Sequence, residues 1–145
     1  MRGEEAPGGK MTKKILIVDD EPAMLTYLST VLQDHGYTTV CSQSAEEAWE
    51  KALEESPDLI TLDLLMPEKT GIKLYKDLRK HDRLGAIPIV IITGFTQEQY
   101  PMIDFRKFIY ERSIRGPEAF LEKPVAPEAL VETVEKVLGC GTQKS

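Results

Sequence analysis

The sequence has no long apolar run, few cysteines and no excess of positive charge. Each wholly apolar stretch of the 145-residue chain is only a few residues long, whereas a membrane-spanning helix needs about 20. We also find no basic start followed by an apolar segment, so we expect a protein that is not secreted and stays in the cytoplasm. The net charge of −6 argues against nucleic-acid binding as the main activity. It suits a surface that meets a cation or a basic partner.

Other absences narrow the chemistry and the organisation. The chain lacks a glycine-rich phosphate loop and a dinucleotide-binding fingerprint, which argues against the common nucleotide-binding enzymes. Its two cysteines, Cys41 and Cys140, are predicted to be free thiols in a reducing compartment. The sequence has no internal repeat, and its composition gives no sign of a second domain. A content of 41% hydrophobic and 29% charged residues is ordinary for one globular domain.

Composition divides the chain into three parts. Residues 1–12 carry glycine, proline and glutamate with almost no apolar side chains, so we expect a disordered lead-in. Residues 13–139 form the predicted domain, and residues 140–145 form a flexible tail. Because this tail is too short for an output module, we expect either a stand-alone protein or a domain cut from a longer one.

Short apolar runs alternate with stretches whose apolar residues follow helical spacing. Runs of about four to six apolar residues are typical of buried parallel strands. Strands are predicted at residues 14–19, 37–41, 58–63, 87–93 and 119–122. Helices are predicted from Pro22 to a stop at Gly36, from a capping box at Ser44 and Glu47 to Pro57, and over 71–81, 102–114 and 127–138.

This alternation predicts an α/β fold with one doubly wound parallel sheet. Right-handed crossovers favour the flavodoxin-like strand order 2-1-3-4-5, with five strands flanked by five helices. The segment between the fourth and fifth strands, 94–118, is extended, and we interpret 102–114 as a fourth helix that covers the sheet. The aromatic and basic residues in this helix leave a second interpretation open, a partner-binding face with aromatic anchors.

Five polar side chains follow four of the predicted strands, and this coincidence carries most of the functional information. Asp19 and Asp20 end the first strand, Asp63 the third, Thr93 the fourth and Lys123 the fifth. Because the carboxyl ends of parallel strands meet at one edge of a sheet, these groups should converge. Each residue alone has an ordinary explanation, since acids are favoured at helix N-termini and threonine in strands.

Three carboxylates in one cleft repel each other unless a cation neutralises them. Oxygen-only ligands favour Mg²⁺, with Mn²⁺ as an alternative, over zinc. An aspartate beside such a cation can attack a phosphoryl group and form an acyl phosphate. Lys123 would supply a positive charge to the phosphoryl oxygens, and Thr93 a hydroxyl hydrogen bond.

At these positions the sequence resembles the receiver domain of two-component response regulators. The matching pieces, in order, are residues 15–22, 63–67 with Gly71, 93–94 and 120–124. The resemblance extends over about residues 14–138 and implies a domain that switches on phosphorylation. Four pieces in order at consistent spacing are a much stronger signal than any one of them.

The resemblance implies a role for each acid of the cleft. Asp63 would accept the phosphoryl group from a phosphohistidine on a sensor histidine kinase or phosphotransfer protein. Asp20 would bind Mg²⁺ directly and Asp19 partly through water, with the backbone carbonyl of Leu65 as a further ligand. Such a domain assists its own phosphorylation and autodephosphorylation without being an enzyme in the turnover sense.

The resemblance also implies a conformational switch. Thr93 and Lys123 would bind the phosphoryl group and couple it to the rest of the domain, and Phe120 occupies the position of the family's switch aromatic. The Lys123–Pro124 peptide bond would be cis. The face formed by helix four, strand five and helix five would then control a downstream protein target or output domain. A phosphorylation-dependent homodimer is a further option.

Two features depart from the family pattern. Thr93 and Lys123 are 30 positions apart, which exceeds the family norm by roughly two helical turns and affects the usual dimerisation face. Leu65 and Phe95 are apolar at positions that help to control the hydrolytic water in the family. We therefore hypothesise that autodephosphorylation is slow.

Two other functions remain as alternatives. The first is a receiver-like protein-interaction module that takes no phosphate, although the chain retains all five polar residues of the cleft. The second is a Mg²⁺-dependent phosphatase with an aspartate nucleophile. Such enzymes place a second aspartate two residues after the first, where this chain has Glu21, and they need a cap domain.

Overall fold

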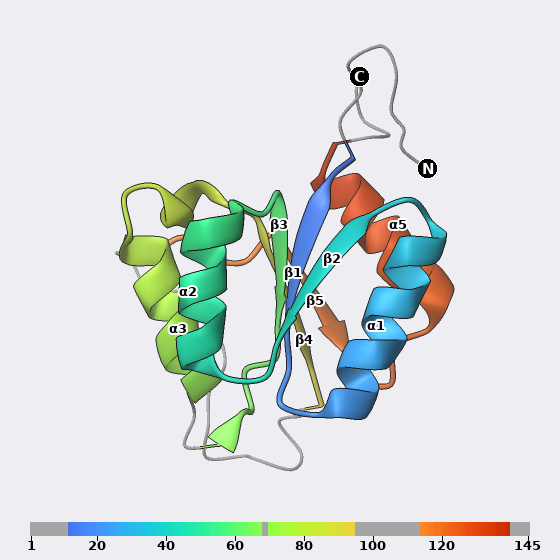
Figure 1. The fold of residues 1–145 in the computed structure, drawn as a ribbon, viewed down its shortest axis with the longest axis horizontal. Coiled ribbons are helices and arrows are strands. Elements are labelled where there is room, and N and C mark those ends of the chain that lie inside the picture. Colours follow the sequence, from blue (N-terminus) through green and yellow to red (C-terminus); the bar gives the residue numbers. More distant parts are fainter. Residues whose placement is uncertain (1–11, 68–69, 95–113, 140–145) are drawn as a thin grey trace.

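The computed structural model describes residues 12–67, 70–94 and 114–139, which form a parallel sheet with helices on both faces (Figure 1). The strand order is β2-β1-β3-β4-β5, and all four strand pairs are parallel, as predicted. The strands are β1 (Lys14–Val18), β2 (Thr38–Ser42), β3 (Leu59–Leu62), β4 (Ile89–Thr93) and β5 (Ala119–Glu122). The helices are α1 (Pro22–Asp34), α2 (Ala45–Glu55), α3 (Thr70–Lys80), the short 3₁₀ helix η4 (Leu84–Ala86) and α5 (Pro127–Val137).

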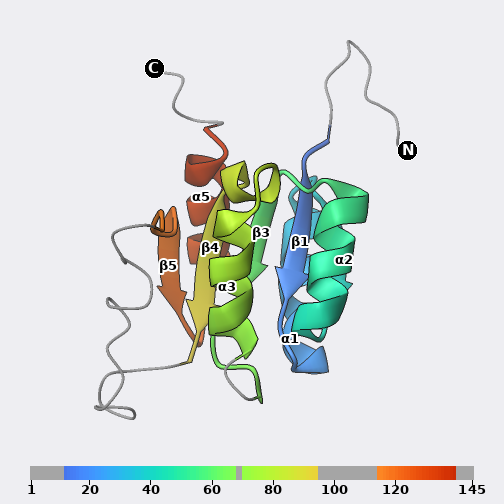
Figure 2. The same ribbon diagram turned by 90° about the vertical axis from the view of Figure 1, so that its left-hand side faces the viewer.

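Two hydrophobic clusters lie on the two faces of the sheet. Helices α2 and α3 cover one face, which Figure 2 views from the front, and α1 and α5 cover the other. Strand β1 serves both clusters, because Leu16 and Val18 pack on the α2–α3 side while Ile15 and Ile17 pack on the α1–α5 side. A central strand that is buried on both sides explains why its sequence reads as a continuous apolar run.

The predicted starts of α1 and α2 are observed, and their causes are local. Pro22 occupies the start of α1, where its missing N–H costs nothing. The Ser44 hydroxyl accepts a hydrogen bond from the Glu47 amide at 3.1 Å. The Glu47 carboxylate in turn accepts from the amide of Gln43 at 3.0 Å. This reciprocal arrangement is a variant of the capping box that the sequence predicts.

Strands β2, β3 and β4 each begin one or two residues later than predicted, and for β2 and β4 the reasons lie in the preceding turns. The amide of Tyr37 donates to the carbonyl of Leu32 and closes α1, so the β2 ladder starts at Thr38 instead. Gly36 makes this closure with a φ of +93°. The short helix η4 lies before β4 and was not predicted. The amide of Ile87 donates to the carbonyl of Leu84 in this helix, so the β4 ladder begins after Ile87.

Several predictions fall on residues that the structure does not describe. These are the disordered lead-in, the flexible tail, the fourth helix at 102–114 and the state of Cys140. The described ranges contain four α-helices and one 3₁₀ helix, against five predicted helices. Cys41 is a free thiol whose burial raises its pKa above the ordinary value. None of the helices in the described ranges reaches the length and apolar character that a membrane crossing requires.

A buried arginine ties α3 to the starts of β4 and β5. The side chain of Arg79 is 1% exposed and donates to the carbonyls of Ile87 and Gly116, both at 2.9 Å. It also pairs with the Glu118 carboxylate at 2.7 Å. The same Glu118 oxygen accepts the amide of Ile89 at 2.7 Å. This network fixes the chain where it enters the last strand of the sheet.

Candidate functional site

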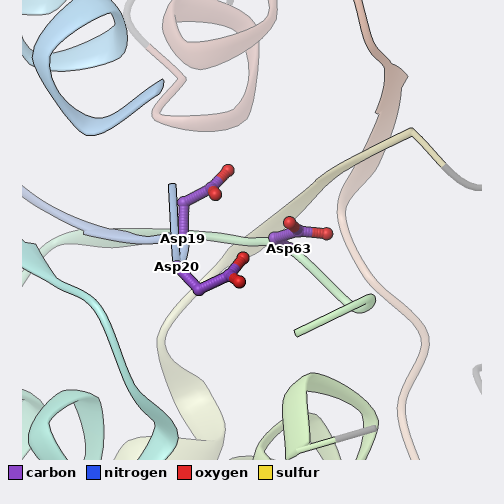
Figure 3. Close-up of side chains that lie close together, drawn as sticks. All are labelled: Asp19, Asp20 and Asp63. Carbon is purple, nitrogen blue, oxygen red and sulfur yellow. The ribbon is translucent and has the colours of Figure 1, made fainter. Parts of the chain in front are cut away.

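Three carboxylates converge at the carboxyl ends of β1 and β3, where the sequence placed them. The amide of Asp63 donates to the carbonyl of Val18 at 3.1 Å, so the ends of the two strands lie side by side. One oxygen from each of Asp19, Asp20 and Asp63 lies within 4.8 Å of the other two. Figure 3 shows the three side chains gathered at these two strand ends.

Lys123 brings a positive charge to the same place from the end of β5. Its Nζ lies 2.9 Å from Asp19 Oδ2 and 3.2 Å from Asp63 Oδ2. The amide of Lys123 donates to the carbonyl of Thr93 at 2.9 Å, which anchors this residue to the end of β4. Nζ also contacts Glu21 Oε1 at 3.1 Å. Sequence reasoning gave Glu21 no role in the cleft, although it lies within residues 15–22, the first piece that resembles the family.

Asp63 is the most thoroughly contacted of the three acids. Its Oδ1 accepts hydrogen bonds at 3.0 Å from the hydroxyl of Thr93 and from the amide of Leu65. Thr93 is fully buried, and Asp63 is only 5% exposed. The two oxygens of Asp63 therefore have different neighbours, two neutral donors on one side and the Lys123 ammonium on the other.

Burial and charge act against each other in this cleft. Desolvation raises the pKa of the Asp19 carboxyl, which is 1% exposed, although the Glu21 amide and Lys123 act in the opposite direction. Burial by itself would lower the pKa of Lys123. Its hydrogen bond to Asp19 and the charges of Asp63 and Asp19 outweigh this effect, so the pKa of Lys123 lies well above its ordinary value. Lys123 is thus held as a cation among the carboxylates.

Helix α3 packs directly against the backbone that follows β3. Gly71 lies so close that an added Cβ would come within 2.7 Å of Leu64 Cα and still nearer to the carbonyl oxygen of Asp63. Such a distance does not occur between packed atoms, so only glycine is accommodated here. Helix α3 therefore holds the backbone of Asp63 and Leu64 from one side.

The residues expected to form the switch lie on β4, β5 and the loop after β5. Thr93 ends β4, and the Lys123–Pro124 bond that follows β5 is cis, as the resemblance implied. Phe120 lies on β5 and is 40% exposed. Phe95, the apolar residue two positions after Thr93, falls outside the described ranges.

The acidic cluster has the chemistry of a site for a hard divalent cation. It offers only oxygen ligands, which Mg²⁺ and Mn²⁺ prefer. Within the described ranges, the carboxylate of Asp20 accepts no hydrogen bond, so its oxygens are free to bind a cation, unlike those of Asp63. One oxygen of Asp19 accepts a hydrogen bond from the amide of Glu21 at 2.9 Å, and the other pairs with the Lys123 ammonium.

The chain is similar to known proteins in both sequence and fold. The sequence matches the family described as "Response regulator receiver domain" over residues 15–135. It is 31% identical over 131 residues to the polar-differentiation response regulator DivK of Brucella ovis, a match that covers 89% of this chain and 98% of DivK. The structure of the chemotaxis response regulator CheY4 of Vibrio cholerae superposes with a TM-score of 0.74 at 29% identity, covering 88% of this chain and 99% of CheY4. NtrX of Brucella abortus superposes with a TM-score of 0.72 at 26% identity, covering 90% of this chain but only 27% of NtrX.

Proposed function

Because the chain belongs to the response regulator receiver domain family, we propose that it is a switch in which Asp63 accepts a phosphoryl group. Receiver domains are signalling domains rather than enzymes in the usual sense. One observation carries the proposal: the Asp63 carboxylate lies between the hydroxyl of Thr93 and the ammonium of Lys123, beside two further carboxylates. That arrangement combines a nucleophile with groups that stabilise a transferred phosphoryl group.

A divalent cation is part of the proposal. Asp19, Asp20 and Asp63 would hold Mg²⁺, with Mn²⁺ as a substitute and the backbone carbonyl of Leu65 as a further ligand. When bound, the cation lowers the electrostatic cost of bringing a phosphoryl group to a carboxylate. The Leu65 amide already donates to Asp63, which keeps this loop at the cleft. We assign direct binding to Asp20 and partly water-mediated binding to Asp19.

The proposed chemical step is a transfer between two nucleophiles. An oxygen of Asp63 attacks the phosphorus of a phosphohistidine, so that an O–P bond forms while the P–N bond breaks and its electron pair returns to the imidazole nitrogen. Lys123 then pairs with phosphoryl oxygens instead of carboxylate oxygens, and the Thr93 hydroxyl donates to another of them. Hydrolysis of the acyl phosphate, assisted by the same residues, resets the domain.

The link from the site to a partner runs through the last two strands. Thr93 and Lys123 are joined by a backbone hydrogen bond, and Phe120 lies three residues before Lys123 on β5. We propose that their rearrangement changes the face that includes β5 and α5, where a downstream protein or an output domain binds. Receiver domains interact with histidine kinases and with downstream targets. Here the proposed donor is a sensor histidine kinase or a phosphotransfer protein in the cytoplasm, and the proposed folded unit is 13–139.

Intact-mass spectrometry after incubation with acetyl phosphate and Mg²⁺ tests the proposal. The wild type and Asp82→Asn, which changes an exposed acid, should each gain one phosphoryl group, whereas Asp63→Asn should gain none. Omission of Mg²⁺ should prevent the gain in all three proteins. If the folded wild type gains nothing from acetyl phosphate or from a phosphorylated histidine kinase, the domain is an interaction module without phosphorylation.

A further inference from the structure

Helices α2 and α3 lie on the face of the sheet opposite to α1 and α5 (Figure 2). Residues of both helices line a groove between them. Its volume is about 1220 Å³, and it contains none of the residues of the acidic cleft. Four of its lining residues are apolar or aromatic, namely Ala45, Trp49, Leu74 and His81. The rings of Trp49 and His81 meet edge to face with their centroids 5.5 Å apart. This gives the groove a rigid aromatic centre above the hydrophobic core.

The α2 wall of this groove carries an unneutralised row of acids. Glu46, Glu50 and Glu54 line it, repeat every four residues and are exposed. No described residue forms an ion pair with any of the three. Glu47, on the same helix, differs because it pairs with Lys51 at 3.4 Å. The row therefore presents three negative charges that no ion pair within the described ranges compensates.

The α3 wall contributes little charge of its own. Lys73 pairs with Asp77 at 2.8 Å on the same helix, which leaves Lys80 as the remaining basic residue of that wall. Acids that repeat every four residues lie on one side of a helix, and their matching partner is a second helix with basic residues at the same spacing. An apolar stripe beside those basic residues would face Trp49, which is only partly buried, as in other helix-in-groove interfaces.

We propose that this groove, defined by the α2 and α3 residues named above, docks a basic amphipathic helix of a partner protein. Charge favours this occupant over a second copy of the chain, because the net charge of −6 opposes self-association. In a symmetric pair, the basic residues that line the described groove and face the acidic α2 walls would be Lys80 and two lysines that are already paired, Lys51 and Lys73. The groove is thus a second contact surface, separate from the proposed phosphorylation site.

Trp49 is the single tryptophan of the chain, so its fluorescence reports directly on the groove. The probe is a synthetic helical peptide of leucine, alanine and arginine, with arginine at every fourth position beside a leucine stripe. A peptide of the same composition in scrambled order is the control. We expect a saturable change in Trp49 emission with the patterned peptide, and affinity at least about tenfold weaker for the scrambled one.

Two charge reversals locate the binding surface. Glu50→Lys and Glu54→Lys should each weaken binding of the patterned peptide by about tenfold. Glu132→Lys, a reversal at an exposed position of α5, should leave the affinity within about twofold. Circular dichroism of each variant establishes that it is folded. Asp63→Asn should bind like the wild type, so loss of phosphorylation and loss of docking are separable results.

Three results would overturn the proposal. The first is no change in Trp49 emission at saturating patterned peptide, with binding absent by calorimetry as well. The second is an equal effect of Glu50→Lys and Glu132→Lys, which would mean attraction by overall charge alone. The third is a dimer in sedimentation experiments that Glu50→Lys dissociates, which would assign the groove to a second copy of this chain.

Discussion

Replacing Lys123 by methionine should destabilise the domain strongly in the absence of divalent cations. Methionine keeps the unbranched apolar stem and removes only the charge. Lys123 is 16% exposed in its side chain and contacts Asp19 and Asp63, which are 1% and 6% exposed. Removing one partner of such a buried pair costs about 3 kcal/mol, because the remaining carboxylates keep their desolvation penalty without compensation.

A divalent cation should reduce this loss, because Lys123 and the cation compete for the same oxygens. Without the ammonium, the three carboxylates should bind Mg²⁺ more tightly. A tenfold gain in affinity corresponds to about 1.4 kcal/mol. By linkage, the destabilisation of Lys123→Met should be smaller by the same amount when Mg²⁺ is saturating.

Urea unfolding followed by circular dichroism measures both quantities, once in EDTA and once in Mg²⁺. Lys136→Met removes an exposed lysine of α5 and should change the free energy of unfolding by less than about 0.5 kcal/mol in either buffer. The reasoning is refuted if Lys123→Met loses no more than this control in EDTA. It is also refuted if its loss is the same with and without Mg²⁺.

Three further predictions follow from the same structure. Asp20→Asn should raise the melting temperature in metal-free buffer by about 2–4 °C, because it relieves repulsion with Asp19 and Asp63, and calorimetry should show no Mg²⁺ binding. A lower melting temperature would contradict a shared pocket. Arg79→Gln should cost about 3 kcal/mol in urea unfolding, whereas Arg83→Gln, at an exposed position, should cost less than about 1 kcal/mol; equal losses would contradict the buried network. The phosphorylated wild type should lose its phosphoryl group over minutes or longer in Mg²⁺, and Leu65→Asn should shorten that half-life; a wild-type half-life of seconds would contradict the apolar shielding of the site.

The strands were the most predictable part of the fold, because each is buried on both faces or ends at a polar residue. The end of β1 before Asp19 and the end of β3 before Asp63 were placed to within one residue. The parallel order followed from the alternation with helices and from the handedness of crossovers. The strand ends and the strand order together are enough to predict that the three carboxylates lie close to one another.

Strand starts and tertiary contacts were less predictable, because they depend on where individual backbone amides are used. Nothing in the local sequence shows that the Tyr37 amide closes α1 rather than joining β2. The contact of Glu21 with Lys123 joins residues 102 positions apart, and an exposed acid gives no signal for it. The burial of Arg79 depends on carbonyls from the segments before β4 and β5, which no local pattern reveals.

The packing of Gly71 against the backbone at Asp63, the proposed acceptor, affects the direction in which the domain can respond. The backbone around Asp63 is held by α3 on one side and by its hydrogen bond to Val18 of β1 on the other. It cannot shift unless a helix and the central strand shift with it. Thr93 and Lys123 contact Asp63 only through their side chains. We therefore expect the acceptor to act as a stationary point, with displacement after phosphorylation confined to the β4–β5 edge of the sheet.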